Sequence, residues 1–408
     1  MAAAPSDGFL ERYADVAVRV GTNLQPGQTL FVNARVEHVP LARAVGAAGW
    51  RAGAGDVQLY YSDDYERYLL ARHGDDERLS RTAAASLGLL QAELEAQGAS
   101  VNIIGDTSPH YFDDADEERL ARTRPVEARK LANRLVNEDR EAWVVIGSPD
   151  ASWAERMFGE PDVARLADEI ARACRLDEPD PVEAWTQHLA RLEQRRTLLT
   201  ERGFDRIHIR GPGTDLTVGL IPGAGWVGGL STTAWGQTFC ANLPTEEVYT
   251  TPHRLRVDGT VRGTRPVSYD EGVLVEGIEL RFAGGAVVEA RAAIGEDFLR
   301  RHLESDAGAG HLGELALVAG SPIGRRGLLF YNTLFDENAT SHLAYGMAYV
   351  APVPGASGLD KEAQLELGIN DSFVHTDFPI GGEGVDVDGL GPGGDRIPIL
   401  TGDEWLLA

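Results

Sequence analysis

Short apolar runs alternate with amphipathic stretches along the first half of the chain. The runs are rich in Val, Ile and Tyr and are bounded by turn residues or polar clusters, which is typical of buried strands. They cover Thr29–Ala34, Val57–Ser62, Ser100–Gly105 and Ala142–Gly147. Helical spacing of apolar residues occurs over Gly8–Val20, His38–Ala52, Ala83–Ala96 and Asp116–Asn137. This alternation predicts an α/β N-terminal domain with a mostly parallel sheet.

The pattern changes near residue 203, after two further predicted helices over Pro161–Arg175 and Pro181–Glu201. Beyond that point, polar and apolar residues alternate with a period of two, which predicts strands joined by Gly-rich turns. The clearest examples are Arg206–Gly211, Thr214–Leu220 and Gly272–Ala292. Helical patterns are sparse, with one over Gly295–Ser305 and another after Asp336. We therefore expect domains over residues 1–200 and 201–408, the second being α+β and dominated by antiparallel sheet.

The charge balance excludes several kinds of partner. The 408 residues include 63 Asp+Glu and 38 Lys+Arg, which gives a net charge of −25. Nucleic-acid binding needs a basic face, and an anionic membrane would repel this chain, so neither partner is expected. The longest uncharged stretch, Leu216–Thr245, contains six Gly and is not a membrane span. With no basic segment followed by an apolar run at the N-terminus, we expect a cytoplasmic protein.

Two other patterns have ordinary explanations. Cys174 and Cys240 are too few for a disulfide framework or a zinc ribbon, so we expect buried thiols. The segment Gly223–Gly228 matches the G-x-G-x-x-G of dinucleotide-binding proteins, but the residues after it do not favour a helix. We expect a glycine-rich turn that packs against the motif that follows it.

Candidate metal-binding residues gather in the second half of the chain. The pair Glu246 and Glu247 ends the long uncharged stretch among strand-forming residues, so only one of the two can face a given site. Glu314 begins an apolar run, where an unpaired carboxylate would be costly to bury. The segment after Asp336 predicts a short helix that would place His342, Tyr345 and Tyr349 on one face.

The pair His375 and Asp377 gives the most informative local pattern. The two residues lie two apart in a strand-like run, so their side chains share a face, and imidazole and carboxylate are suitable ligands for a divalent transition metal. Each candidate alone could be a solvated carboxylate or a packed aromatic residue. Together they supply the nitrogen and oxygen ligands of a two-metal hydrolase, in which the ions lie ~3.5–4 Å apart. Spacing alone leaves open whether the residues converge.

The order of these motifs resembles that of the M29 family of metallo-aminopeptidases, which includes aminopeptidases T and S. The resemblance extends over the whole chain and rests on Gly213–Leu216, Asn242–Pro252, Gly313-Glu314, Glu337–Tyr349 and His375–Gly381. It implies a dinuclear metal site in the C-terminal domain with the ligands Glu247, Glu314, His342, His375 and Asp377. It also implies that Tyr349 is an active-site tyrosine, and it favours Glu247 over Glu246 as a ligand. Pro379 departs from the family pattern, in which Met is common at this position. This departure puts the substrate specificity in doubt more than the activity.

The implied activity is the metal-dependent release of N-terminal residues from short peptides. Two divalent ions, with Zn²⁺ fitting the ligand set and Co²⁺ or Mn²⁺ also able to occupy it, would activate a bridging water and polarise the scissile carbonyl. Tyr349 would donate a hydrogen bond to the oxyanion, and Glu246 or Glu337 would relay a proton or hold the substrate amine. The family further suggests a homodimer. Two alternatives stay open: a related metal-dependent amidase with a non-peptide substrate, and a metal-binding homologue that has lost catalysis.

Overall fold

The computed structural model describes residues 5–408 except 107–111, 113, 124–126, 129, 132–138 and 270–272. Its described residues form two compact units. The first contains residues 1–187 and 230–244, and the second contains residues 188–229 and 245–408. Helix α10 (Pro181–Arg202) carries the chain from the first unit into the second. No described helix combines the length and apolar character that crossing a membrane requires.

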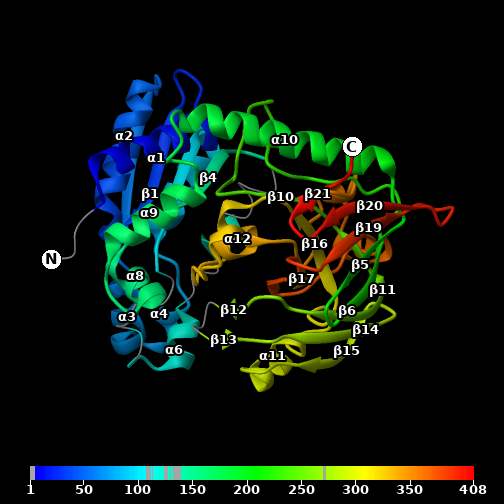
Figure 1. Ribbon diagram of the computed structural model, residues 1–408. Helices are drawn as coiled ribbons and strands as arrows, with labels where there is room; N and C mark the ends of the chain where they lie inside the picture. Colours follow the sequence, from blue (N-terminus) through cyan, green and yellow to red (C-terminus); the bar gives the residue numbers. More distant parts are fainter. Residues whose placement is uncertain are drawn as a thin grey trace. The chain divides into compact units, whose positions relative to one another are not determined.

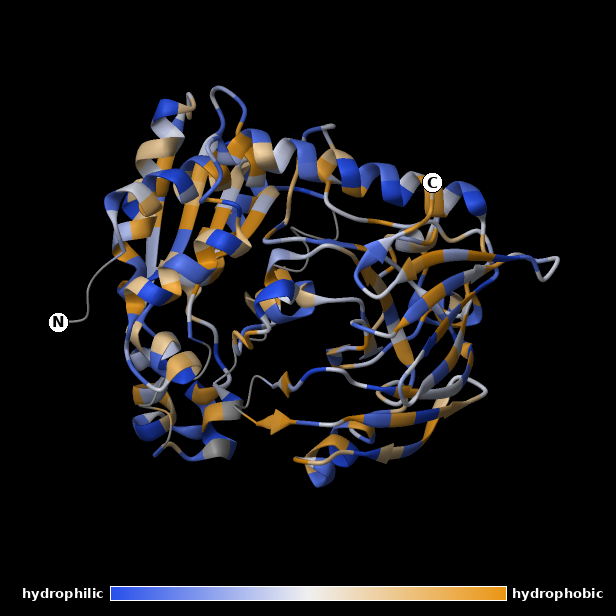
Figure 2. Ribbon diagram, in the orientation of Figure 1, coloured by the Kyte–Doolittle hydropathy of each residue, from blue (hydrophilic) through white to orange (hydrophobic). Residues whose placement is uncertain are grey.

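A five-stranded parallel sheet forms the centre of the first unit, as the alternating pattern predicts. The strands lie in the order β2 (Asp56–Ser62), β1 (Thr29–Arg35), β3 (Ala99–Ile104), β4 (Ala142–Gly147) and β9 (Asn242–Leu243). Figure 1 shows β1 and β4 among helices, and Figure 2 shows the strands of this sheet as mostly hydrophobic. Both cysteines are buried thiols outside any disulfide, as expected.

The helices of the first unit follow the predicted ranges closely. They include α1 (Asp7–Val16), α2 (Val39–Arg51), α5 (Ala84–Ala96) and α9 (Val163–Ala173). Helix α1 continues into a π-helical turn over Ala17–Gly21, which completes the predicted range. Of the helix predicted over Asp116–Asn137, the structure describes α6 (Glu117–Arg122), and much of the remainder lies outside the described residues.

Antiparallel sheets dominate the second unit, which confirms the predicted class, and two of them are large. The larger has eight strands, in the order β15 (Ala286–Arg291), β14 (Glu279–Ala283), β11 (Pro252–Arg262), β6 (Thr214–Leu220), β5 (Arg206–Gly211), β19 (Asp386–Leu390), β20 (Arg396–Thr401) and β21 (Glu404–Trp405). The smaller, which we call the four-stranded sheet, has the order β10 (Glu247–Thr250), β16 (Leu312–Val318), β17 (His342–Gly346) and β18 (His375–Pro379). The predicted helix at Gly295–Ser305 appears as α11 (Glu296–Leu303).

The helix predicted after Asp336 is wrong. Helix α13 (Thr333–Asp336) and a single 3₁₀ turn (Glu337–Ala339) end before His342, and residues 342–346 form the strand β17. Pairing with β16 on one side and β18 on the other outweighs the helical preference of a short Leu-Ala segment. Tyr345 consequently faces away from His342, and its hydroxyl lies 2.8 Å from that of Tyr269.

The glycine-rich segment forms the expected turn. Val227 bridges Tyr249 on β10, and a methyl group at Gly228 would lie 2.7 Å from the backbone oxygen of Glu247. Only glycine allows the two backbones to approach so closely. The segment therefore packs against the strand that carries Glu247, as expected.

Gly313 gives a test of how tightly the four-stranded sheet is built. A methyl group there would overlap the backbone oxygens of Met347 and Gly346, beside the register shift next to Glu314. We expect Gly313→Ala to lower the free energy of unfolding by about 1–3 kcal/mol in urea titrations. Gly358→Ala is the control, because a methyl group at Gly358 meets nothing within 4 Å. Equal stability of the two variants would contradict this packing.

Candidate metal centre

The four-stranded sheet brings all five predicted ligands to one face. Glu314 pairs with Ala344 and Ala344 with Asp377, while Gly346 pairs with His375. His342 pairs with Ala316, which in turn pairs with Tyr249, two residues after Glu247. Paired residues in neighbouring strands share a face, and so do alternate residues within a strand. The register alone therefore places Glu247, Glu314, His342, His375 and Asp377 together.

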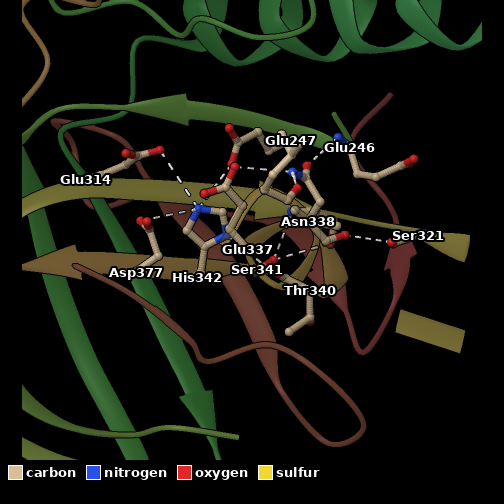
Figure 3. A network of polar contacts seen from close by, with 12 residues as sticks. Glu246, Glu247, Glu314, Ser321, Glu337, Asn338, Thr340, Ser341, His342 and Asp377 are labelled. Atoms are coloured by element: carbon tan, nitrogen blue, oxygen red, sulfur yellow. Dashed lines mark hydrogen bonds and ion pairs between the residues drawn. The ribbon is translucent and has the colours of Figure 1, made fainter. Parts of the chain in front are cut away.

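The ligand atoms form two groups that share Glu314. Glu247, Glu314 and His342 make one group, and Glu314, His375 and Asp377 make the other, with the ligand atoms in each group within 4.8 Å of one another. The Nε2 of His342 lies 3.1 Å from Oε2 of Glu247 and 3.9 Å from an oxygen of both Glu314 and Asp377 (Figure 3). The Nε2 of His375 lies 3.4 Å from Glu314 and 3.5 Å from Asp377.

Both imidazoles are oriented by backbone carbonyls. The Nδ1 of His375 lies 2.8 Å from the oxygen of Met347, and the Nδ1 of His342 lies 3.3 Å from that of Thr340. A carbonyl can only accept, so the proton of a neutral ring resides on Nδ1 and the lone pair of Nε2 points into the site. This is the usual arrangement of metal-binding histidines.

The charges of the site favour the binding of a cation. Burial alone would lower the pKa of His342, but its close contact with Glu247 and the charges of Glu247, Asp377 and Glu314 raise that pKa to about 10. Burial raises the pKa of Glu314 to about 7, against the opposing contact with His375. Oε2 of Glu247 is buried and accepts no hydrogen bond. Buried carboxylates, one without a hydrogen bond, next to two imidazoles fit a site for divalent cations.

The acidic pair divides as the strand geometry predicts. Glu246 is buried, but its carboxylate lies 3.4 Å from Nε2 of His188 on α10, and Figure 3 shows it directed away from His342. Glu337 follows α13 and faces the site. Burial raises its pKa well above the usual range, and the charges of Asp377 and Glu247 raise it further.

Tyr349 lies at the exposed edge of the site. It follows the end of β17, is 41% exposed, and its ring centroid is 5.0 Å from that of His375. The ring of Tyr249, 5.6 Å from that of Tyr349, completes an aromatic pair beside the carboxylates. Sequence reasoning missed Tyr249, although its place two residues after Glu247 on the same strand could have indicated it. It also assigned no contact to Asn338, which is buried next to Glu337.

Comparisons with known proteins show which proteins this chain is similar to. A family model described as thermophilic metalloprotease (M29) matches residues 6–405. The chain is 39% identical to aminopeptidase 2 of Geobacillus stearothermophilus over 403 residues, with 97% of each chain covered. It is 40% identical to aminopeptidase T of Thermus thermophilus over 407 residues, with 98% of each covered. The solved structure of wild-type AmpT from Thermus thermophilus superposes with a TM-score of 0.90 at 38% identity, covering 98% of this chain and 99% of that one.

Metal binding should stabilise the folded protein. Zn²⁺ or Co²⁺ added to metal-stripped protein at a hundred times its dissociation constant should raise the free energy of unfolding by about 2.7 kcal/mol, seen as a higher thermal midpoint. His375→Ala should reduce this gain because it deletes a ligand from one of the two groups. His208→Ala is the control, since His208 lies on β5 of the other sheet. A gain retained in full by His375→Ala would show that the cation binds elsewhere.

Proposed function

The chain belongs to the M29 family of metalloproteases, and from this premise we propose that it is an aminopeptidase that uses two divalent cations to release N-terminal residues from short peptides. The observation that supports two cations is the position of Glu314, which both ligand groups share. Zn²⁺ fits the imidazole and carboxylate ligands, and Co²⁺ or Mn²⁺ could take its place. When bound, such cations would polarise the substrate carbonyl and activate a water molecule.

We assign a separate task to each residue of the site. Glu247, Glu314, His342, His375 and Asp377 hold the cations. Tyr349, partly exposed beside His375, donates its hydroxyl proton in a hydrogen bond to the oxyanion that develops on the substrate. Glu337 is the carboxylate that accepts a proton from the attacking water and passes it to the leaving amine, or that binds the substrate amine. We prefer Glu337 to Glu246 because the carboxylate of Glu246 lies next to His188. The homodimer and the cytoplasmic location stay predictions.

Substrates with free and blocked N-termini separate the possible activities. An aminopeptidase should hydrolyse a series of free-amine peptides in the presence of metal and reject the same peptides after N-acetylation. Chromatography of the products measures the cleavage. Equal cleavage of the acetylated peptides would instead favour the amidase alternative. Stoichiometric metal without cleavage of any peptide would favour a homologue that has lost catalysis. Lower turnover as the peptides lengthen is expected if the substrates are short.

Tyr349→Phe tests the assigned oxyanion contact. Removing one such donor typically lowers kcat by about 10²–10³-fold, and we expect that loss with little change in KM or in metal affinity. Tyr61→Phe is a matched control, because Tyr61 is also 41% exposed but lies on β2 of the parallel sheet. Unchanged kcat in Tyr349→Phe would remove this residue from the mechanism.

A further inference from the structure

A buried amide lies next to the candidate metal centre. Asn338, in the 3₁₀ turn between α13 and β17, is 1% exposed. Its Oδ1 accepts a hydrogen bond of 2.7 Å from the backbone N–H of Glu246, and its Nδ2 donates one of 3.0 Å to the backbone oxygen of Leu334. The same Nδ2 lies 3.4 Å from Oε1 of Glu337 (Figure 3).

The partners of Asn338 allow only one orientation of the amide. Exchanging Oδ1 and Nδ2 would place two donors together at Glu246 and acceptors together at both Leu334 and Glu337. The backbone of Asn338 is also held, because its oxygen accepts a hydrogen bond of 2.6 Å from Oγ of Ser321. Ser321 is itself fixed as the N-terminal cap of helix α12 (Pro322–Arg326). The amide is therefore a rigid group with a donor and an acceptor at defined positions.

Asn338 acts where the strand that carries Glu247 begins. Glu247 is the first residue of β10 and pairs with Val318, so the N–H of Glu246 lies one residue before the ladder. Oδ1 of Asn338 supplies the acceptor at that position. On the other side of the strand, the carboxylate of Glu246 lies next to His188. Two contacts of Glu246 thus hold the backbone that leads to Glu247. Its N–H donates to Asn338, and its carboxylate lies next to His188.

We infer that Asn338 is a positioning residue that sets Glu247 and Glu337 relative to each other, an inference that rests on the proposed function. Its acceptor fixes the backbone next to Glu247, and its donor fixes the carboxylate of Glu337. The two carboxylates come from segments about ninety residues apart in the sequence, and one side chain touches both segments. Residues that orient metal ligands in this way typically contribute 10–100-fold to metal affinity or activity.

Metal titration of variants tests this role separately from turnover. Calorimetry and the visible absorption of bound Co²⁺ measure metal binding to metal-stripped protein. The dissociation constant of Asn338→Ala should be about 10–100-fold higher than that of the unchanged protein. Asn338→Asp keeps the acceptor for the N–H of Glu246 but places an oxygen next to Glu337 and the backbone oxygen of Leu334. It should lose less metal affinity than Asn338→Ala, and its kcat for a free-amine peptide should fall at least tenfold with KM nearly unchanged.

Asp388→Asn is the matched control for a general loss of stability. Asp388 is buried in the eight-stranded sheet, where it pairs with Arg210 at 3.1 Å and with Arg396. This variant should lower the thermal midpoint while leaving the Co²⁺ dissociation constant unchanged. The inference is overturned if Asn338→Ala binds Co²⁺ as tightly as the unchanged protein, or if Asp388→Asn loses as much affinity. If Asn338→Ala does not fold, an unchanged kcat in Asn338→Asp overturns it. Failure of the unchanged protein to bind Co²⁺ would contradict the proposed function as well.

Discussion

Burying several carboxylates on one face of a sheet is the constraint that shapes this protein. Glu247, Glu314 and Asp377 lie against two imidazoles with little access to water, and Glu337 adds a fourth carboxyl group beside them. Ionised groups in such a place repel one another and lose their hydration, which costs free energy unless a positive charge compensates. Both imidazoles use Nδ1 for a backbone carbonyl, so Nε2 can bind a cation without a proton. The excess of negative charge and the donor atoms of the site therefore favour the same partner, a divalent cation.

Backbone pairing, more than any local motif, produces this arrangement. The four antiparallel strands come from segments that begin at residues 247, 312, 342 and 375, and their register brings one or two ligands from each to the same face. A shift of one residue in any strand would turn its ligand to the opposite face. Tight backbone approaches at Gly228 and Gly313 help fix that register, because neither position has room for a side chain. The amide of Asn338 then holds the backbone next to Glu247 through the N–H of Glu246.

Much of this could be predicted from the sequence, where a pattern was strong and local. The apolar runs predicted the parallel sheet, and alternation predicted that His375 and Asp377 share a face and that Glu246 and Glu247 do not. The segment around His342 failed, because a short Leu-Ala stretch favours helix in isolation and becomes a strand only through pairing with β16 and β18. Asn338 was missed as a positioning residue because its importance comes from the N–H of Glu246 and the carboxylate of Glu337, which meet only in the fold. The family resemblance indicated that the separate motifs form one site, which their spacing alone could not do.

We propose that Glu314 is a ligand of two cations, one in each ligand group. Anomalous scattering from crystals of the metal-loaded protein, measured at the absorption edges of Zn and Co, tests it most directly. Two peaks per chain are expected, each about 2.0–2.2 Å from its imidazole and carboxylate ligand atoms, with Glu314 in contact with both. One of the peaks should be bound by His342 and Glu247, and the other by His375 and Asp377. A single peak, or peaks that do not contact Glu314, would contradict it.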